Sequence, residues 1–318
     1  MNILGVLSHP EFGPWAIGPL EIHSFGLVVA IGIVIGLLLA GRRGQRIIGV
    51  APEQIHNFAI WMIIFGWCFS HVFAVLLYSP DQVVEDPLIL FKFWGEISSV
   101  GGLVGAAIAF MIWARRNPEL DHLKWVNIAM WSIPIGFFFG RVGCTLAFDH
   151  PGQKASEFGL WNWFHEATGG AVPELFPLAM EFPERWGGGI RHNLGFYEAL
   201  LWLGLMILFL WLGRKPRRRG LYVWLLPILY APFRFLLDFL RAMPDEVAFG
   251  GDPRYLGMTP AQYTSIAFLA VGIYLWYRLK DQPVEQWVIH DQNTNTTAPS
   301  TEGESPKKKK SKKKKKTE

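Results

Sequence analysis

Long apolar runs alternate with short charged connections along most of this chain. A membrane-spanning helix needs about 20 mostly apolar residues, and seven runs approach that length between boundaries rich in charge, Gly or Pro. They cover residues 23–41, 57–78, 97–114, 125–142, 194–213, 221–240 and 261–279. The pattern predicts an all-α polytopic membrane protein with seven transmembrane helices.

Lys and Arg in the connections predict the orientation, because basic residues near span ends stay on the cytoplasmic side. The connections after spans one, three and five hold 11 of them, whereas the longer connections after spans two, four and six hold six. The N-terminus is therefore predicted outside and the C-terminus in the cytoplasm. Residues 1–22 contain no Lys or Arg, so span one lacks the basic region of a cleavable signal peptide and is expected to be retained.

The same pattern divides the chain into three parts. They are an extracytoplasmic segment at 1–22, a seven-helix domain at 23–280, and a Lys-rich cytoplasmic tail at 281–318. Two outer connections are long, an arm at 79–96 and a loop at 143–193, and the loop has enough aromatic residues to fold as a small cap. Chemistry is therefore expected on the outer face.

Composition supports a membrane protein, since 51% of residues are apolar and 18% are charged, against about 25% charged in soluble domains. The net charge of +4 comes from the last 18 residues, with nine Lys and three Glu, so the other 300 residues sum to −2 and no nucleic-acid partner is expected. The tail has almost no apolar residue after Val288 and cannot bury a core, so residues 281–318 are predicted to be disordered. The tail is either a solvated spacer or is attracted to anionic lipid of the inner leaflet.

Charged residues inside the apolar runs are functional candidates, because each is costly in a bilayer. By the predicted topology, Arg141, Glu198, Arg234 and Asp238 all fall in its outer half. Tyr230, Arg234 and Asp238 succeed one another at four-residue spacing on one helix face. Two arginines beside two carboxylates predict a pocket for an anionic head group, since Arg binds phosphate through two donors at once. The alternative is a structural ion pair buried between helices.

The roles of three further residues are left open by the sequence. His71 lies in the middle of span two, where a histidine is costly unless it is used. His192 is either a polar anchor at the membrane interface or a catalyst, and the next residue, Asn193, is placed to cap span five. Cys144 is either a small buried thiol or a nucleophile without an obvious paired base.

Short motifs succeed one another in a single order over residues 20–280. They are Ser24-Phe25-Gly26-Leu27, Asp86-Pro87-Leu88, Gly101-Gly102-Leu103-Val104-Gly105, Gly140-Arg141-Val142-Gly143 through Gly152, Arg191-His192 with Tyr197-Glu198, Tyr230 through Arg234 with Asp238 and Arg241, and Gly257-Met258-Thr259 with Gln262 and Ser265. In this order they resemble the prolipoprotein diacylglyceryl transferase family of bacterial membrane enzymes, whose members also have seven spans and an outside N-terminus.

The resemblance implies transfer of a diacylglyceryl group from phosphatidylglycerol to the lipobox cysteine thiol of prolipoproteins, with release of glycerol 1-phosphate, at the bacterial inner membrane. The implied partners are phosphatidylglycerol, prolipoprotein signal peptides and membrane lipid, and no cofactor or metal is expected. Arg141 and Arg234 would bind the phosphate, Asp238 would orient Arg234, and Tyr230 would contact the substrate. The candidate catalytic residues are His71, Tyr230, Asp238 and Glu198. The candidate phosphatidylglycerol-binding residues are Arg141, Arg234, Gly152, Cys144, Asp149, Tyr197 and His192.

Several family positions carry other residues. Val100 stands where the family has a histidine before the paired glycines. Cys144 stands in place of an asparagine, Phe25 in place of a tyrosine, and Asp149 and Asp238 each in place of a glutamate. In span two, Phe69-Ser70-His71 stands in place of a Gly-Gly-Arg pattern. One hypothesis is a working transferase whose proton acceptor has moved to His71, His192 or Asp149. The other is a non-catalytic or differently catalytic phospholipid-binding paralogue that keeps the arginines. Valine cannot accept a proton, so the proton acceptor separates the two hypotheses.

Overall fold

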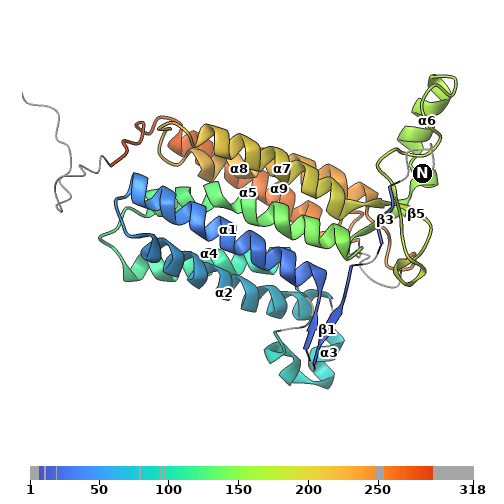
Figure 1. Cartoon of the computed structure of the whole chain (residues 1–318), viewed down its shortest axis with the longest axis horizontal. Coiled ribbons are helices and arrows are strands. Elements are labelled where there is room, and N and C mark those ends of the chain that lie inside the picture. Colours follow the sequence, from blue (N-terminus) through green and yellow to red (C-terminus); the bar gives the residue numbers. More distant parts are fainter. Residues whose placement is uncertain are drawn as a thin grey trace, which may run out of the picture.

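A computed structural model describes residues 7–10, 12–18, 20–78, 80–93, 95, 97–247, 252 and 254–288. Seven long helices in this part form a bundle (Figure 1). They are α1 (Ser24–Ile47), α2 (Pro52–Tyr78), α4 (Ser99–Arg116), α5 (His122–Leu146), α7 (Leu194–Leu212), α8 (Leu221–Leu237) and α9 (Pro260–Leu279). Each overlaps one apolar run predicted from the sequence.

Five of these helices, α1, α2, α5, α7 and α8, are long and apolar enough to cross a membrane. On α1, the side chains of Leu27, Ile31, Val34 and Leu38 lie on successive turns of one face and are each 44–55% exposed. Such a face is unfavourable in water and suits contact with lipid. The chain is a mostly helical polytopic membrane protein, and membrane spanning by α4 and α9 stays a prediction.

Helix α5 is central to the bundle, since it packs against α1, α7 and α8. Its buried Trp125 stacks edge-on against Phe58 of α2. Further along, Trp131 belongs to a buried cluster with residues of α7, and its indole nitrogen donates to the carbonyl of Phe209 at 2.7 Å. These contacts hold the first half of α5, and Arg141 lies near its other end.

The structure is not purely helical, and the all-α prediction is wrong in this respect. Strands β1 (Trp15–Ile17) and β2 (Leu20–Ile22) form an antiparallel hairpin. A second sheet, antiparallel and in the order β3-β5-β4, joins β3 (Pro151–Lys154), β4 (Met180–Glu181) and β5 (Ile190–Asn193). Strands of two to four residues are too short to show an alternating apolar pattern, which is why the sequence did not reveal them.

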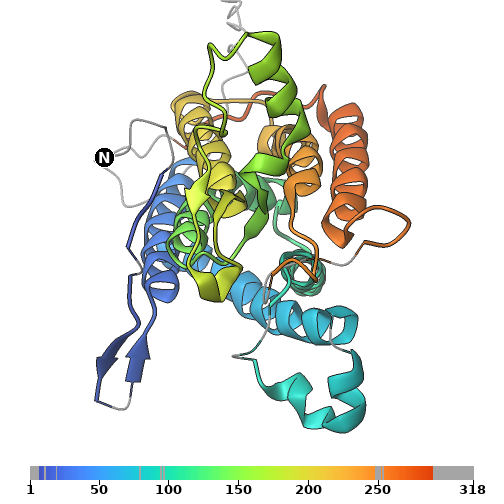
Figure 2. The same ribbon diagram turned by 90° about the vertical axis from the view of Figure 1, so that its right-hand side faces the viewer.

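The loop after α5 folds as a cap at one end of the bundle, which faces the viewer in Figure 2. Besides its sheet it contains η2 (Ala155–Glu157), α6 (Gly159–Ala167) and η3 (Glu184–Trp186). Buried Phe148, Met180 and Phe182 form a small core. The side chain of Arg191, buried in the cap, donates to the carbonyls of Gly152 and Gly188. The cap is thus held by apolar packing and by one buried guanidinium.

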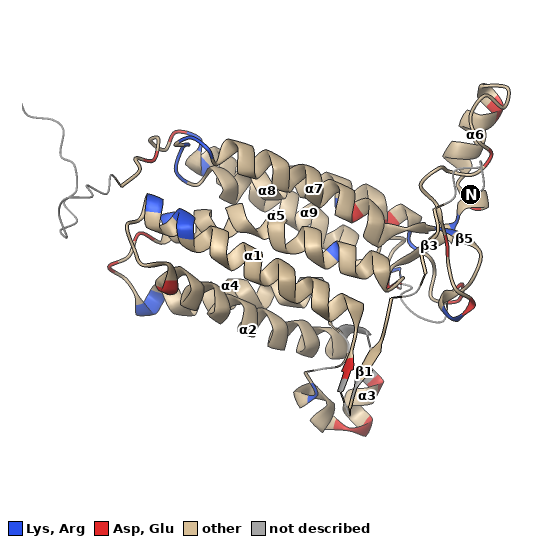
Figure 3. Ribbon diagram, viewed as in Figure 1, with Lys and Arg blue, Asp and Glu red and all other residues tan. Residues whose placement is uncertain are grey.

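The arm contains α3 (Pro80–Glu85) and η1 (Pro87–Phe91) and lies at the same end as the cap (Figure 1). A last short helix, η4 (Asp238–Leu240), continues α8 at this end. At the opposite end, Lys and Arg gather in the connections between helices (Figure 3). The basic residues counted for the orientation therefore mark one end of the bundle.

The predicted tail begins at residue 281, yet its first residues pack against the basic connections. Backbone hydrogen bonds of 2.8–2.9 Å join Glu285 to Arg217 and Val288 to Arg46, and the Arg46 guanidinium lies 4.8 Å from the Trp287 ring centre. The side chains of Trp287 and Val288 are partly buried there, and Trp287 packs against a core cluster of the bundle. Residues 289–318, where disorder was also predicted, lie outside the described residues.

We expect Trp287→Ala to lower the free energy of unfolding in mixed detergent micelles by about 1–3 kcal/mol, because a half-buried ring and its cation–π contact are lost. A protein truncated after Val288 is the control and is expected to unfold like the full chain. If the truncated protein lost as much free energy of unfolding as Trp287→Ala, the conclusion that the packed part of the tail ends at Val288 would be wrong.

Candidate active site

A shared carboxylate joins two arginines at the cap end of the bundle. Glu198, on α7, lies with Oε2 2.5 Å from Nε of Arg141 on α5 and with Oε1 3.1 Å from Nε of Arg234 on α8. All three side chains are at least 90% buried. Asn193 begins α7 and caps it, as predicted, by accepting from the Phe196 amide at 3.1 Å. This cap fixes the first turn of α7, from which Glu198 reaches both neighbouring helices.

A second carboxylate continues the cluster. Asp238, fully buried at the end of α8, accepts from Arg234 and from the Thr259 hydroxyl. It also lies 3.7 Å from Nε of Arg241. Thr259 is the capping residue of α9, in a capping box with Gln262. Asp238 therefore ties Arg234 to the beginning of α9.

The ion pairs leave the arginines with donors for another acceptor. Glu198 engages each guanidinium through Nε, so neither pair uses the two-donor geometry that Arg offers to a carboxylate. An Arg side chain has five N–H donors, and the Nη groups are the ones that match a phosphate. Tyr230 lies beside Glu198 and both arginines, with its ring 4.7 Å from that of Trp202. The arrangement can bind an anionic group between preorganised cations.

The segment after α5 brings a histidine to this cluster. Phe148 has a left-handed backbone with φ of 52° and is buried in the cap core, and the amide of the next residue, Asp149, donates to the carbonyl of Cys144, so a tight turn ends α5 here. His150 then lies with Nε2 2.7 Å from Nη1 of Arg141 and with Nδ1 3.3 Å from Asp149. Burial alone would raise the pKa of Asp149, but His150 and the nearby arginines hold that pKa below its usual range. Asp149 is therefore ionised at neutral pH.

Cys144 is buried one turn after Arg141, and its Sγ lies 3.7 Å from Nη1 of that arginine. The possible ligand atoms of Cys144, Asp149 and His150 all lie within 4.8 Å of one another, close enough to bind one metal ion. Here the guanidinium of Arg141 contacts both Cys144 and His150. A positive charge on those atoms opposes a second cation, so these residues do not fit a metal.

Gly152, His192 and Tyr197 support the site from the cap side. A Cβ on Gly152 would lie 2.7 Å from the Leu240 carbonyl and 2.8 Å from the Cβ of His192, so only glycine allows this close packing. Nδ1 of His192 lies 2.9 Å from the Tyr197 hydroxyl, and burial lowers the pKa of His192 to about 4. His192 is therefore neutral near pH 7 and acts as a polar anchor for Tyr197.

His71 lies apart from the arginines. Its Nε2 is 2.8 Å from the carbonyl of Ile89, and its ring meets that of Phe93 edge-on, so it faces the arm. No contact between His71 and the arginine cluster is present among the described residues. Val100 is in the first turn of α4, and its side chain lies outside the described part.

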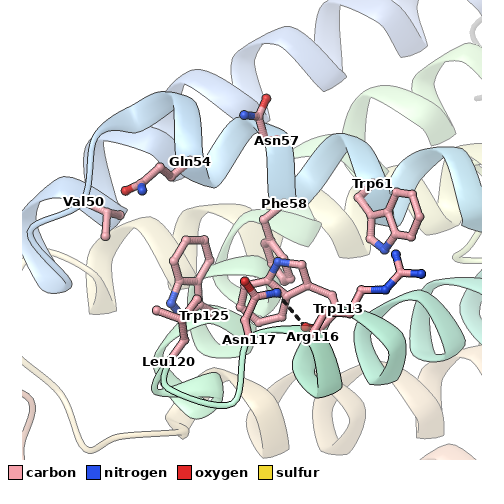
Figure 4. A pocket seen from close by; sticks show the side chains of 10 residues that line it. All are labelled: Val50, Gln54, Asn57, Phe58, Trp61, Trp113, Arg116, Asn117, Leu120 and Trp125. Atoms are coloured by element: carbon pink, nitrogen blue, oxygen red, sulfur yellow. Dashed lines mark hydrogen bonds between the residues drawn. The ribbon is translucent and has the colours of Figure 1, made fainter.

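A cavity of about 410 Å³ lies at the opposite end of the bundle, between the start of α2, the end of α4 and the start of α5 (Figure 4). Four of its ten lining residues are aromatic, among them Trp61, Trp113 and Trp125, and Arg116 also lines it. Trp125 precedes Arg141 by 16 residues on α5, which is about 24 Å along a helix. This cavity is therefore separate from the arginine cluster.

Comparison with known proteins agrees with the geometry. Residues 14–278 match the family model described as prolipoprotein diacylglyceryl transferase. The chain belongs to this family. The match covers the seven long helices up to the last residue but one of α9, together with the cap and the arginine cluster.

Curated relatives extend over nearly the same region. A protein of Chromohalobacter salexigens is 28% identical over 284 residues, covering 88% of this chain and 97% of the relative. Proteins of Xylella fastidiosa strain M23 and Nitratidesulfovibrio vulgaris are each 31% identical, covering 86% of this chain and 93% and 96% of their own lengths. All three are named phosphatidylglycerol–prolipoprotein diacylglyceryl transferase.

The candidate site contains one residue that the sequence argument missed. His150 has no apolar run around it and no spacing that links it to Arg141, which is nine positions away. The only local signal was the Asp149-His150 pair directly before Pro151 and Gly152.

Removing the shared charge is expected to destabilise the protein. Glu198→Gln leaves Arg141 and Arg234 facing each other in a buried site without their common counter-charge, so we expect the free energy of unfolding to fall by about 3–5 kcal/mol. Unfolding in mixed detergent micelles measures this loss. Glu166→Gln, on an exposed position of α6, is the matched control. A loss as small as that of the control would mean that the cluster does not hold these helices together.

His192 is expected to make stability depend on pH. Unfolded histidine takes up a proton near pH 6.5, whereas buried His192 stays neutral to about pH 4, so acid favours the unfolded state between these values. We expect the wild type to lose up to about 3 kcal/mol more than His192→Gln between pH 7 and pH 4. Unfolding measured at several pH values gives the difference, and parallel curves for the two proteins would contradict the expectation.

Proposed function

We propose that this protein transfers a diacylglyceryl group from phosphatidylglycerol to the cysteine thiol of a prolipoprotein. Family membership and the names of relatives that align over most of the chain support the reaction. The single observation that carries the proposal to this chain is the buried pair of arginines, Arg141 and Arg234, held side by side by Glu198.

In the proposed reaction the thiol attacks a glycerol carbon and a phosphate oxygen leaves with the second glycerol. Negative charge grows on that oxygen as the bond breaks, and donors already aimed at it stabilise the transition state. Arg141 and Arg234 supply these donors. Glu198 holds both guanidinium groups, Asp238 orients Arg234, and Tyr230 contacts the lipid beside them.

The membrane arrangement is part of the proposal. All seven long helices span the bacterial inner membrane, with the N-terminus outside and the C-terminus in the cytoplasm. The basic connections at one end of the bundle support this orientation, because they are retained on the cytoplasmic side (Figure 3). The cap, the arm and the arginine cluster then face outward, where they meet the signal peptide and its lipobox.

A second candidate function is a phospholipid-binding paralogue without thiol chemistry. The observation that favours it is Val100, which stands where the family resemblance places a histidine. Such a protein would keep the anion-binding cluster and bind phosphatidylglycerol without transferring its diacylglyceryl group.

Purified protein with phosphatidylglycerol and a synthetic lipobox peptide tests the proposal, with the mass gain of the peptide as the readout. We expect transfer by the wild type and a loss of about 10²- to 10³-fold in Arg141→Lys and Arg234→Lys, since Lys cannot reproduce the planar donors. Arg116→Lys, at the cavity of Figure 4, is the control and is expected to keep full activity.

The two candidate functions give different outcomes in the same assay. Wild-type protein that binds phosphatidylglycerol and never modifies the peptide would favour the paralogue. Growth of a strain depleted of its own transferase, supported by this gene, would favour the enzyme.

A further inference from the structure

The acceptor thiol of the proposed reaction needs a group that takes its proton. A cysteine thiol has a reference pKa near 8.5, so only a few per cent is thiolate at neutral pH. A proton acceptor at the site raises the rate by about 10²- to 10⁴-fold, provided that it titrates near the working pH and lies beside the reacting groups. Histidine is the side chain that best meets the first condition.

Among the described histidines, His150 is the one bonded to an arginine of the cluster. His71 binds the Ile89 carbonyl in the arm, and His192 is fully buried against Tyr197. His165 binds the carbonyl of Val172 in the cap. His9 binds the carbonyl of Thr145 and stacks on the ring of Phe148. Among the described histidines, His150 is therefore the one whose ring contacts a phosphate-binding donor.

The neighbours of His150 determine which of its nitrogens carries the proton. Nη1 of Arg141 can only donate, so Nε2 of His150, 2.7 Å away, accepts and bears a lone pair. The ring proton is then on Nδ1, which faces the ionised carboxylate of Asp149 at 3.3 Å. A neutral imidazole with a carboxylate behind it is the arrangement of a general base, since the carboxylate stabilises the imidazolium that forms.

We propose that His150 is the proton acceptor of this site and that Asp149 is its positioning residue. The proposal rests on the proposed transferase function. When the lipid phosphate binds, it competes for Nη1 of Arg141, and Nε2 of His150 is released toward the incoming thiol. One donor thus links substrate binding to the exposure of the base.

Atoms and electrons balance in the proposed step. The thiol proton moves to Nε2 of His150, and the sulfur forms a bond to the glycerol carbon as the bond from that carbon to the phosphate oxygen breaks. The electron pair of the broken bond stays on the phosphate of glycerol phosphate, beside the arginines. The imidazolium, paired with Asp149, then returns its proton to water or to the released phosphate.

The test compares transfer rates over pH for the wild type and His150→Gln, with phosphatidylglycerol and the lipobox peptide. The charged and titratable groups facing His150 are Arg141, Cys144, Asp149 and Glu198. We expect His150→Gln to lose about 10²-fold or more at pH 7 and less than about 10-fold at pH 9, where the peptide thiol ionises without help. Binding of phosphatidylglycerol, measured by native mass spectrometry, is expected to be unchanged.

His165→Gln is the matched control, because it alters a histidine of the cap away from the cluster. Asp149→Asn keeps the imidazole and is expected to move the acid limb of the rate profile to lower pH, which a purely structural role would not do. This variant also provides the answer if His150→Gln does not fold.

The outcomes separate the two proposals. A wild type that transfers, with a His150→Gln variant equally active at every pH, would overturn the role of His150 and leave the proposed function intact. A loss of the same size at pH 7 and pH 9 would overturn the proton-acceptor role as well. A wild type that binds lipid without transfer would overturn the proposed function, and the proton acceptor with it.

Discussion

The carboxylate of Glu198 is the interaction on which the site depends. Within an apolar bundle, the charges of Arg141 and Arg234 require a nearby counter-charge, and one carboxylate supplies it to both. This sharing fixes α7 between α5 and α8 at the cap end. It also brings two cations close together, an arrangement that would be strongly repulsive without Glu198. The fold and the capacity to bind an anion therefore have the same origin.

The way in which the charges pair decides what the site can bind. Because Glu198 takes the Nε atom of each arginine, the outer nitrogens are left for other acceptors. In this structure Nη1 of Arg141 meets His150, and Nη1 of Arg234 meets Asp238. Asp238 restricts Arg234 through a second contact and is itself held by Thr259. A ligand phosphate then meets donors that have already lost their conformational freedom, which lowers the cost of ordering them on binding.

Features that depend on local chemistry could be predicted from the sequence. Seven apolar runs became seven helices, and four charged residues stood out because each is costly inside an apolar run; the structure brings Arg141, Glu198, Arg234 and Asp238 together. Features that depend on the path of the chain in space were missed. Whether His71 faces the arm or the cluster depends on the rotation of α2, which an evenly apolar helix does not reveal. The pairing of β3 with β5 and the docking of Trp287 on Arg46 also form only through partners distant in the sequence.

The segment from Arg141 to Gly152 shows why the site belongs to the loop as much as to the helices. Its first residue joins the ion-pair cluster, and a left-handed turn at Phe148 follows the end of α5. Its last residue packs without a side chain against Leu240 and His192. Between these two fixed ends, Asp149 and His150 have little freedom to turn away from Arg141. Gly152 and Phe148 are set by the conformation and packing of the backbone. Their positions nevertheless determine the distance between the guanidinium of Arg141 and the imidazole of His150. The chemistry of the cluster therefore rests on packing in the cap, outside the membrane-spanning helices.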